Sequence, residues 1–424
     1  MIQQKILLTW LASILMFCSA CNAIPGDGRF SGFEKVIDVD HITPVPGEPG
    51  QKIIDLNIPA TKDVKFDYNR ILKDLRFVQL EKTSNSAIGH IDKIFFSDNR
   101  IIVADLSVTE SVFIFDASGR FINKIAANKN SQSGPTTDVA NILDVAYYYN
   151  TSEIVIHDDK KNRTYYFDST GRLERFEKEY IDFFQFYNFK NTDHFIYLAL
   201  YSPNKHIPLL TKSDFYLGKA NTQILHTDPN SVQSVKIKPF YNYKDNLSFS
   251  NDGSIFYTPV FSDTIYFIDG KQLNAYPKFA LHFPGPEVIP KIKEDPHAID
   301  MTILNKFYNS HQYYYFLGKI LSAGDSIYYI ECYKDNRLGF FYSEKTGKFI
   351  GGNIESWMTS SDSSVMEGYQ YPIASTGSEF VSILSPGDVY PRSNILWTTG
   401  FSKAVANMVP NGNPMLVFYK LKQF

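Results

Sequence analysis

Aspartate residues recur at matching positions in the first half of this 424-residue sequence. Asp92 and Asp144 are 52 residues apart, each at the start of a predicted strand, and Asp105 and Asp158 are 53 residues apart, each at a strand end. If a repeated fold gathers such equivalent residues around one axis, Asp92 and Asp144 become candidate ligands for Ca²⁺, which binds six to eight oxygen atoms. The alternative is that these carboxylates end strands and accept hydrogen bonds from turn amides.

A histidine beside one of these carboxylates suggests acid–base chemistry. His157 precedes Asp158, and a neighbouring carboxylate can orient a histidine as a general base. With Asp105, these residues are the candidate catalytic groups of a hydrolase or lyase at the mouth of a central channel. The alternative is a solvated strand end. The residue equivalent to His157 in the preceding repeat is Ala104, so a ring of histidines around a metal is not predicted.

Aromatic residues late in the chain suggest ligand binding instead. Four of them lie in segments rich in Ser, Gly and Pro, which predict loops: Trp357, Tyr369, Tyr390 and Trp397. Exposed rings in loops can stack on sugar rings or anchor a protein partner, whereas packing beneath a long loop is the alternative. The sequence contains no nucleophile elbow, phosphate loop, dinucleotide fingerprint or paired-histidine zinc motif.

A repeated hairpin must position these residues. The segment SVFIFDASGRFINKI returns as NRTYYFDSTGRLERF, and the turn glycines Gly119 and Gly171 are 52 residues apart. Weaker echoes follow around Gly218, Gly270 and Gly347. A repeat of this length that is built of short β-strands predicts the blades of a propeller.

Five such units and a closing region predict six blades. Runs of apolar residues between Asn, Asp and Gly turns predict antiparallel hairpins in each unit. The gap before the fifth unit contains an insert from Pro284 to Gly318, with the apolar spacing of a short helix at Ile299, Ile303, Leu304 and Phe307. The segment RFVQLE (76–81) and the C-terminal PMLVFYKLK should share the last blade, because an open ring would expose a strand edge. The prediction is an all-β fold over residues 51–424, a six-bladed β-propeller whose N-terminal and C-terminal strands share the last blade, with a helical insert in a late blade.

The first 21 residues have the pattern of a bacterial lipoprotein signal peptide. A basic start and an apolar run precede the sequence Cys18-Ser19-Ala20-Cys21, which makes Cys21 the predicted lipidated residue. Ordinary secretion is the alternative, since Cys18 stands where Leu is typical. Residues 22–50, rich in Pro and Gly, are predicted to be a flexible tether. The protein is then exported and attached to the outer membrane through its lipid alone, either periplasmic or surface-exposed.

The composition narrows the range of partners. A net charge of −3 with mixed signs argues against a nucleic-acid partner, which would need a basic stripe. With Cys18 removed and Cys21 acylated, Cys332 is the one remaining thiol. The mature chain would therefore have no internal disulfide, and its stability must come from its core. Cys332 lies in a strand-like segment, which predicts a small buried apolar residue.

Several of these segments carry a resemblance to a known family. The run RFVQLEKTSNSAIGHIDKIFFSDNRIIVAD, the hairpin SVFIFDASGRFINKI and the ending NPMLVFYKLK resemble the six-bladed β-propeller lipoproteins of Gram-negative gut commensals. These are related in shape to NHL-repeat and TolB-like propellers. The resemblance covers roughly residues 70–424 and implies the fold and a place in the cell envelope. It implies no reaction and no catalytic residue.

Two functions remain open at this stage. The first is a non-enzymatic binding module, a lipid-anchored propeller that presents a loop-rich face to a glycan, a peptide or an envelope protein, without a cofactor. The second is the hydrolase or lyase described above. A convergent polar cluster or a metal site at the axis would favour catalysis, and exposed rings on one face would favour binding.

Overall fold

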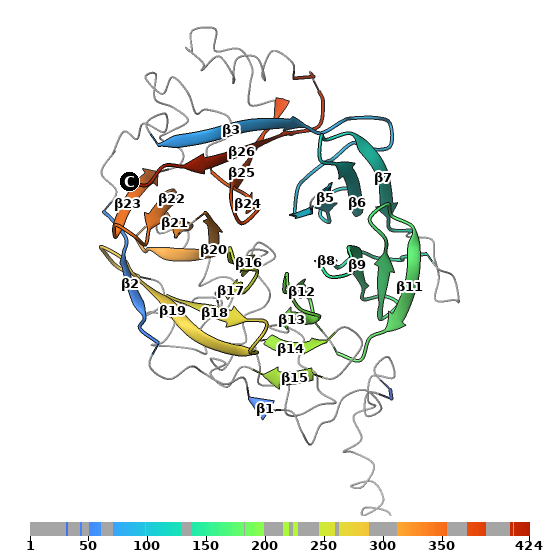
Figure 1. Ribbon diagram of the computed structural model, residues 1–424, viewed down its shortest axis with the longest axis horizontal. Coiled ribbons are helices and arrows are strands. Elements are labelled where there is room, and N and C mark those ends of the chain that lie inside the picture. The colour runs from blue at the N-terminus through green and yellow to red at the C-terminus, as the bar shows by residue number, and fades with distance from the viewer. Residues whose placement is uncertain are drawn as a thin grey trace, which may run out of the picture.

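Each predicted repeat folds into one sheet, and six sheets surround a common axis in the computed structural model (Figure 1). The structure describes residues 31–32, 43–44, 51–60, 71–97, 99–128, 138–181, 183–198, 215–219, 224–227, 246–258, 263–287, 312–324, 326–353, 371–386, 408–409 and 411–424. Named elements in these residues are all strands. No helix among them is both long and apolar enough to cross a bilayer.

The first three blades are antiparallel meanders that run outward from the axis. The first blade contains β4 (Lys93–Ser97), β5 (Arg100–Asp105), β6 (Ser111–Asp116) and β7 (Phe121–Ala126). The second contains β8 (Asp144–Tyr148), β9 (Glu153–Asp158), β10 (Arg163–Phe167) and β11 (Leu173–Lys178). The third contains β12 (Gln185–Asn188), β13 (His194–Leu198), β14 (Phe215–Lys219) and β15 (Ile224–Thr227).

The remaining blades follow the same plan. The fourth contains β16 (Leu247–Phe249), β17 (Ile255–Tyr257), β18 (Thr264–Asp269) and β19 (Asn274–His282). The fifth contains β20 (Tyr315–Ala323), β21 (Ile327–Lys334), β22 (Asn336–Ser343) and β23 (Lys348–Asn353). The sixth contains β24 (Ala374–Ser375), β25 (Phe380–Leu384), β26 (Met415–Leu421) and, as its outermost strand, β3 (Leu72–Gln79).

The two ends of the domain close the ring, as the sequence predicts. β3 pairs antiparallel with β26, with Gln79 opposite Met415 and Leu72 opposite Leu421. Asn413, just before β26, is buried and joins the two ends further. Its side-chain amide donates to Glu81 O at 2.8 Å and to Ser86 O at 2.6 Å, and its Oδ1 accepts from Ile88 N at 3.0 Å.

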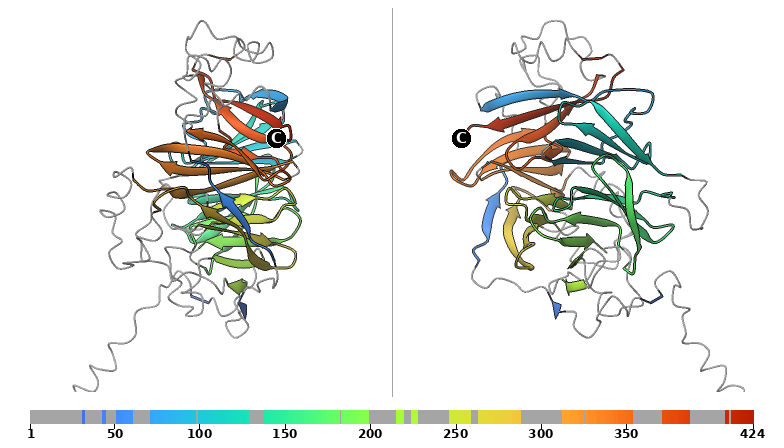
Figure 2. Two further views of the ribbon diagram at one scale, coloured as in Figure 1. Left: turned by 90° about the vertical axis from the view of Figure 1, so that its left-hand side faces the viewer. Right: turned by 45° about the vertical axis from the view of Figure 1, so that its right-hand side comes forward.

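Three short described segments before β3 contact the outside of the blades. Lys178 Nζ at the end of β11 donates to Ser31 O at 2.9 Å. β1 (Thr43–Pro44) pairs parallel with β15, and β2 (Ile54–Asn57) pairs parallel with β19. Both strands add a fifth, outermost position to their sheets, and Figures 1 and 2 show β2 beside β19 at the rim. Parts of the predicted tether therefore contact the second and third blades.

The core lies between the blades. Six clusters of buried hydrophobic side chains occupy the described part of the chain, one between each pair of neighbouring sheets. Successive side chains of a strand point to opposite faces, so Phe113 of β6 packs towards the sixth blade while Val112 and Ile114 pack towards the second. Cys332 is fully buried between the fourth and fifth blades, in agreement with its predicted place.

Two details differ from the sequence-based expectation. The end of the predicted insert belongs to the propeller, because β20, the innermost strand of the fifth blade, begins at Tyr315. Gly218 is not a turn glycine equivalent to Gly119, since it lies within β14 and pairs with Phe195. The residues expected to form the helical insert, Ile299 to Phe307, lie outside the described residues.

The closure predicts a strong effect of one substitution. Asn413→Ala removes three buried hydrogen bonds. It leaves Ser86 O and Ile88 N without this partner, each costing roughly 1–3 kcal/mol, whereas Glu81 O still accepts from Ser86 Oγ. We expect the free energy of unfolding to fall by about 3 kcal/mol or more, measured by urea denaturation. Asn99→Ala, at an exposed position in the turn between β4 and β5, serves as the control and should change stability by less than about 0.5 kcal/mol. Equal effects of the two substitutions would contradict this role for Asn413.

Candidate functional site at the propeller axis

A buried ion pair joins the innermost strands of the first two blades. Lys93 at the start of β4 places Nζ 2.7 Å from both carboxylate oxygens of Asp144 at the start of β8. Both residues are buried. Burial raises the pKa of Asp144, and the Lys93 ammonium opposes that rise. The predicted metal ligand Asp144 therefore has a cationic side chain of the protein as its partner.

The same lysine reaches the third blade. Lys93 Nζ also donates to Val145 O at 3.2 Å and to Phe186 O at 3.5 Å, while Asp144 Oδ2 accepts from Phe186 N at 2.8 Å. Innermost strands have one edge without a neighbouring strand, and their backbone groups need other partners when water is excluded. Lys93 and Asp144 supply those partners for β8 and β12.

Hydroxyl groups have the same role on the other side of the axis. Ser248 Oγ of β16 donates to Ile320 O of β20, and Ser375 Oγ of β24 donates to Ser322 O of β20. In the reverse direction, Ser322 Oγ donates to Phe249 O at 3.3 Å. Side-chain to backbone hydrogen bonds thus connect the inner strands of the fourth, fifth and sixth blades.

Aromatic rings from non-adjacent blades meet at the axis. Phe95 of the first blade and Tyr187 of the third have ring centroids 6.1 Å apart, and Tyr149 of the second and Phe249 of the fourth are 5.7 Å apart. Lys190, in the turn after β12, holds Nζ 5.2 Å from the Tyr149 centroid and 4.8 Å from the Phe249 centroid. Burial lowers the pKa of Lys190 to about 8. Contacts between rings that skip a blade show that side chains fill this part of the axis.

Backbone amides donate to the repeated aspartates at the ends of the second strands. Asp105 is fully buried. Its Oδ2 accepts from Gly89 N and His90 N at 2.8 and 3.1 Å, and its Oδ1 accepts from Val108 N and Thr109 N at 3.0 and 3.1 Å. Four backbone amides therefore occupy the carboxylate, which connects the segment before β4 to the turn after β5.

Asp158 and Asp92 have related partners. Asp158, also fully buried, accepts from Ala140 N at 2.7 Å and from Lys161 N at 3.1 Å. Asp92 Oδ2 accepts from Leu106 N and Ser107 N at 2.6 and 2.7 Å. Asp105, Asp158 and Asp92 therefore all accept hydrogen bonds from backbone amides, as the alternative to a functional role predicts. No group of three or more His, Cys, Asp or Glu among the described residues is placed to hold an ion, and a metal-ligand role for Asp92 and Asp144 stays a prediction.

His157 lies inside the interface between the second and third blades. It is 2% exposed and stacks on Phe183, with ring centroids 4.1 Å apart. In the sheet it stands opposite Asp144 on one side and Thr164 on the other. Burial lowers its pKa to about 4, so the ring is neutral at physiological pH. Its Nδ1 has no hydrogen-bond partner within the described ranges, and Asp158 binds backbone amides rather than this ring.

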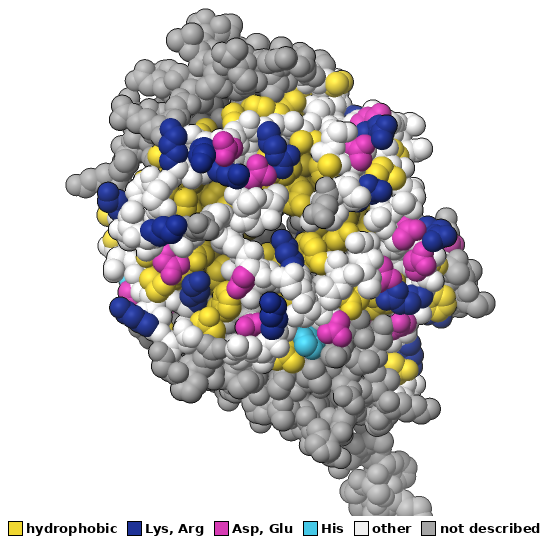
Figure 3. All heavy atoms as spheres, in the orientation of Figure 1, with side chains coloured by type: hydrophobic (Ala, Val, Ile, Leu, Met, Phe, Trp, Pro, Cys, Tyr) yellow, Lys and Arg dark blue, Asp and Glu magenta, His cyan; other side chains and the backbone are white. Residues whose placement is uncertain are grey.

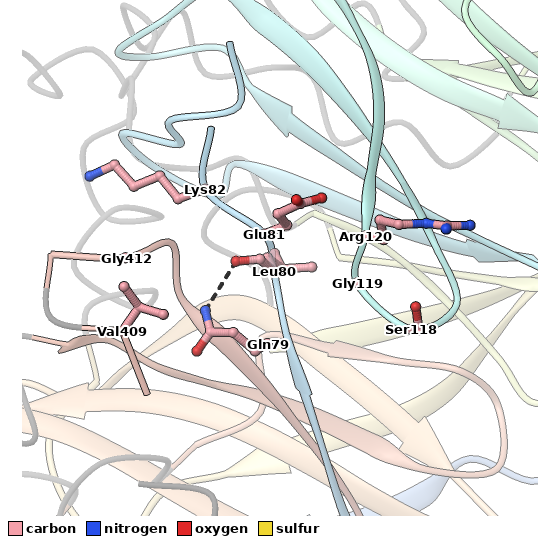
Figure 4. Close-up of a pocket in the computed structure, with 9 residues that line it drawn as sticks. All are labelled: Gln79, Leu80, Glu81, Lys82, Ser118, Gly119, Arg120, Val409 and Gly412. Atoms are coloured by element: carbon pink, nitrogen blue, oxygen red, sulfur yellow. Dashed lines mark hydrogen bonds between the residues drawn. The ribbon is translucent and has the colours of Figure 1, made fainter. Parts of the chain in front are cut away.

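A pocket that sequence reasoning missed lies at the seam between the sixth and first blades (Figure 4). It has a volume of about 340 Å³ and is lined by the end of β3, the turn between β6 and β7, and Val409 and Gly412 before β26. Three segments far apart in the sequence form it, so no local motif indicates it. The four predicted ligand-binding aromatics, Trp357, Tyr369, Tyr390 and Trp397, lie outside the described residues.

One face of the molecule is mixed in character. Figure 3 shows acidic and basic side chains interspersed over this face, with hydrophobic side chains around a hollow near its centre. The described atoms visible there form no continuous basic stripe. This face therefore has no large region of one charge that would attract a ligand of the opposite charge.

Sheet order, closure and axial packing define the chain as a six-bladed β-propeller. It belongs to the family described as "Domain of unknown function (DUF4934)", whose model matches residues 51–420. No curated protein matches the sequence.

Two solved structures that match the chain come from Bacteroides species. A "Putative exported protein" of Bacteroides fragilis NCTC 9343 is 16% identical, with a TM-score of 0.68 over 87% of this chain and 100% of that chain. A member of the DUF4221 family from Bacteroides vulgatus ATCC 8482 is 10% identical, with a TM-score of 0.44 over 83% of this chain and 98% of that chain. The first likeness supports the fold. The lipoprotein character and the relationship to NHL-repeat and TolB-like propellers stay predictions.

The axial ion pair predicts a pH-dependent loss of stability. Lys93→Met leaves Asp144 buried without its cation, so the folded-state pKa of Asp144 rises further above the ordinary value of about 3.9. Stability is then retained below that value and lost as the pH rises. We expect a deficit of about 3–5 kcal/mol at neutral pH that shrinks towards pH 4, measured by urea denaturation across this range.

A matched double variant separates charge from shape. Lys93→Met combined with Asp144→Asn removes both charges and leaves an acceptor for Phe186 N. Most of the neutral-pH deficit should be recovered in this variant. A deficit of Lys93→Met that does not change between pH 4 and pH 8 would show that packing, rather than the Asp144 charge, is responsible.

His157 predicts the opposite pH dependence. Its pKa is lowered from an ordinary value of about 6.5 to about 4, so the unfolded chain binds a proton first. Stability is present above pH 6.5 and is lost as the pH falls towards 4, by up to about 3 kcal/mol. His157→Gln should flatten the slope of melting temperature against pH in this window. An unchanged slope would refute the assignment, whatever the absolute stability of the variant.

Proposed function

We propose that this protein is an exported lipoprotein whose propeller is a non-enzymatic binding module for a glycan, a peptide or an envelope protein. Its lipid on Cys21 attaches it to the outer membrane, on the periplasmic or the outer side. The similar Bacteroides fragilis protein is described as a "Putative exported protein", which supports export, as does the Cys18-Ser19-Ala20-Cys21 sequence. The chain needs no cofactor for this function.

The observation that carries the proposal is the direction of the strands. Antiparallel pairing places the ends of β19, β23 and β25 and the starts of β20, β24 and β26 on one face, the face where Asp105 ends β5 and β4 begins. The segments with Trp357, Tyr369, Tyr390 and Trp397 connect these strand ends. Loops on a rigid scaffold commonly carry binding residues, and rings within them suit sugars or proteins.

Catalysis by Asp105, His157 and Asp158 has less support. Backbone amides occupy both carboxylates, and the histidine ring packs inside a blade interface. A general base must come within hydrogen-bond reach of the proton that it removes, and burial of these three groups opposes that approach.

An array experiment tests the binding function. The chain from residue 22 onward, free of signal and lipid, is applied to glycan and peptide arrays together with Trp357→Ala and Trp397→Ala variants. We expect a ligand whose signal falls about tenfold or more in at least one variant, because such rings carry much of the binding energy at interfaces. Phe176→Ala, at an exposed position on β11, is the control and should retain binding. A ligand retained fully by both tryptophan variants would refute a role for these loops.

A further inference from the structure

We propose that the seam pocket between the sixth and first blades binds a neutral, hydroxyl-rich ligand, a single sugar unit of a glycan. This inference deepens the proposed binding function by naming a ligand class and a second site. It does not depend on the loop aromatics. Its volume of about 340 Å³ lies at the small end of the range for ligand pockets, which suits one or two rings.

The pocket is rigidly built where the two ends of the domain meet. Gln79 Nε2 donates to Leu80 O at 3.0 Å and to Asn413 O at 2.7 Å, and Glu81 N donates to Gly119 O at 2.8 Å. Gly119 has φ of 88°, and a Cβ there would lie 2.2 Å from Gln79 O. Only glycine permits this approach, so the wall formed by the turn has a fixed distance from the strand end.

One acceptor in this wall lacks a partner. Gln79 Oε1 is buried and has no hydrogen-bond partner among the residues that the structure describes, although its amide nitrogen is used twice. A buried acceptor without a donor costs free energy, and a ligand hydroxyl would remove that cost if the Gln79 amide turned towards the pocket. The carboxylate of Glu81 adds a second acceptor. Its Oε2 accepts from Phe121 N at 2.7 Å, while Oε1 has no contact within the described chain.

Donors and an apolar surface complete the lining. Arg120 uses Nε to contact Asp116 Oδ2 at 3.0 Å, and its side chain is 77% exposed, so both terminal nitrogens remain for a ligand oxygen. Val409 is 56% exposed, and its apolar side chain could cover the C–H face of a sugar ring. Figure 4 shows Val409 and Gln79 on one side of the strand end and Arg120 on the other.

The charges around the pocket favour a neutral ligand. Lys82 and Arg120 are balanced by Glu81 and by Asp116, the partner of Arg120. Lys82 Nζ donates to Asn411 O and is therefore partly committed. An anion or a cation would meet charge of its own sign, whereas hydroxyl groups both donate to Gln79 and Glu81 and accept from Arg120.

The second blade provides a matched control. Asp168, Gly171 and Arg172 repeat the turn of Asp116, Gly119 and Arg120, with Arg172 Nε 3.3 Å from Asp168 Oδ2 and a side chain that is 75% exposed. There the turn packs on Asn123 of β7, whose Nδ2 donates to Thr170 O at 2.8 Å. Arg172→Ala thus removes the same side chain from the same turn at a place without the pocket lining of the seam.

A thermal-shift experiment tests the inference on the full chain in detergent. The probes are the methyl glycosides of glucose, galactose, mannose, fucose and N-acetylglucosamine, with Gly-Gly as a zwitterionic peptide and sodium phosphate as an anion. A ligand that binds the folded state raises the melting temperature. We expect at least one glycoside to do so, with an apparent affinity that falls about tenfold or more in Arg120→Ala and in Glu81→Gln, and that is unchanged in Arg172→Ala.

Three results would overturn the inference: no glycoside shift, a shift for Gly-Gly or phosphate alone, or a glycoside shift that both pocket variants retain. Melting temperatures without ligand identify a variant that is simply unfolded, and Val409→Ser then provides a third pocket substitution at an exposed position. The outcome separates from that of the proposed function. Array binding that is lost in Trp357→Ala or Trp397→Ala but kept in Arg120→Ala would remove the pocket site and leave the binding module intact.

Discussion

The innermost strand of every blade has an edge without a neighbouring strand, and the ring depends on side chains that satisfy these edges across blade boundaries. The protein uses two chemical solutions. Lys93 and Asp144 connect three blades with one ion pair and its hydrogen bonds, whereas Ser248 and Ser375 connect the blades on the other side with neutral hydroxyl groups. A lysine has three donors on a long stem, so one residue can serve several carbonyls, but the charge then requires a buried carboxylate nearby.

This constraint explains why aspartate and histidine residues of types that also occur in active sites are held here by groups of the fold itself. A carboxylate is the strongest side-chain acceptor for backbone amides, so a fold that must terminate many strands near its axis uses aspartate there repeatedly. Asp105 shows the result, with four amide donors and no exposed surface. His157 also serves the packing of the fold. Its ring stacks on Phe183, and the ring can be buried because it is neutral.

Periodicity in the sequence predicts the number of blades, their order and the closing pair of strands, because each repeat is one meander with turns of defined chemistry. It could not predict the axial contacts. Lys93 has no counterpart in the second repeat, where Val145 follows Asp144, so its role depends on the three-dimensional convergence of inner strands. The sequence pattern also wrongly assigned the start of β20 to the insert. Both faces of this strand are buried, so the aromatic run around Tyr315 shows no alternation of apolar and polar residues. The prediction that Gly218 lies in a turn was wrong for a different reason. Glycine occurs both inside strands and in turns, and the sequence alone does not distinguish the two positions.

The seam pocket shows how a repeat fold acquires a distinct site. In the turns at Gly119 and Gly171, backbone amides donate in the same way to Asp116 and Asp168. The two turns differ in the residues that they pack against. Gly171 packs on the Asn123 side chain of β7, the fourth strand of the first blade, whereas Gly119 packs on the backbone of β3, the N-terminal strand that completes the otherwise C-terminal sixth blade. Closure therefore breaks the repeat at one boundary, where the segment before β26 contributes a wall. Because the same contacts hold the ring closed and shape the pocket, occupation of the pocket and stability of the closure are thermodynamically linked.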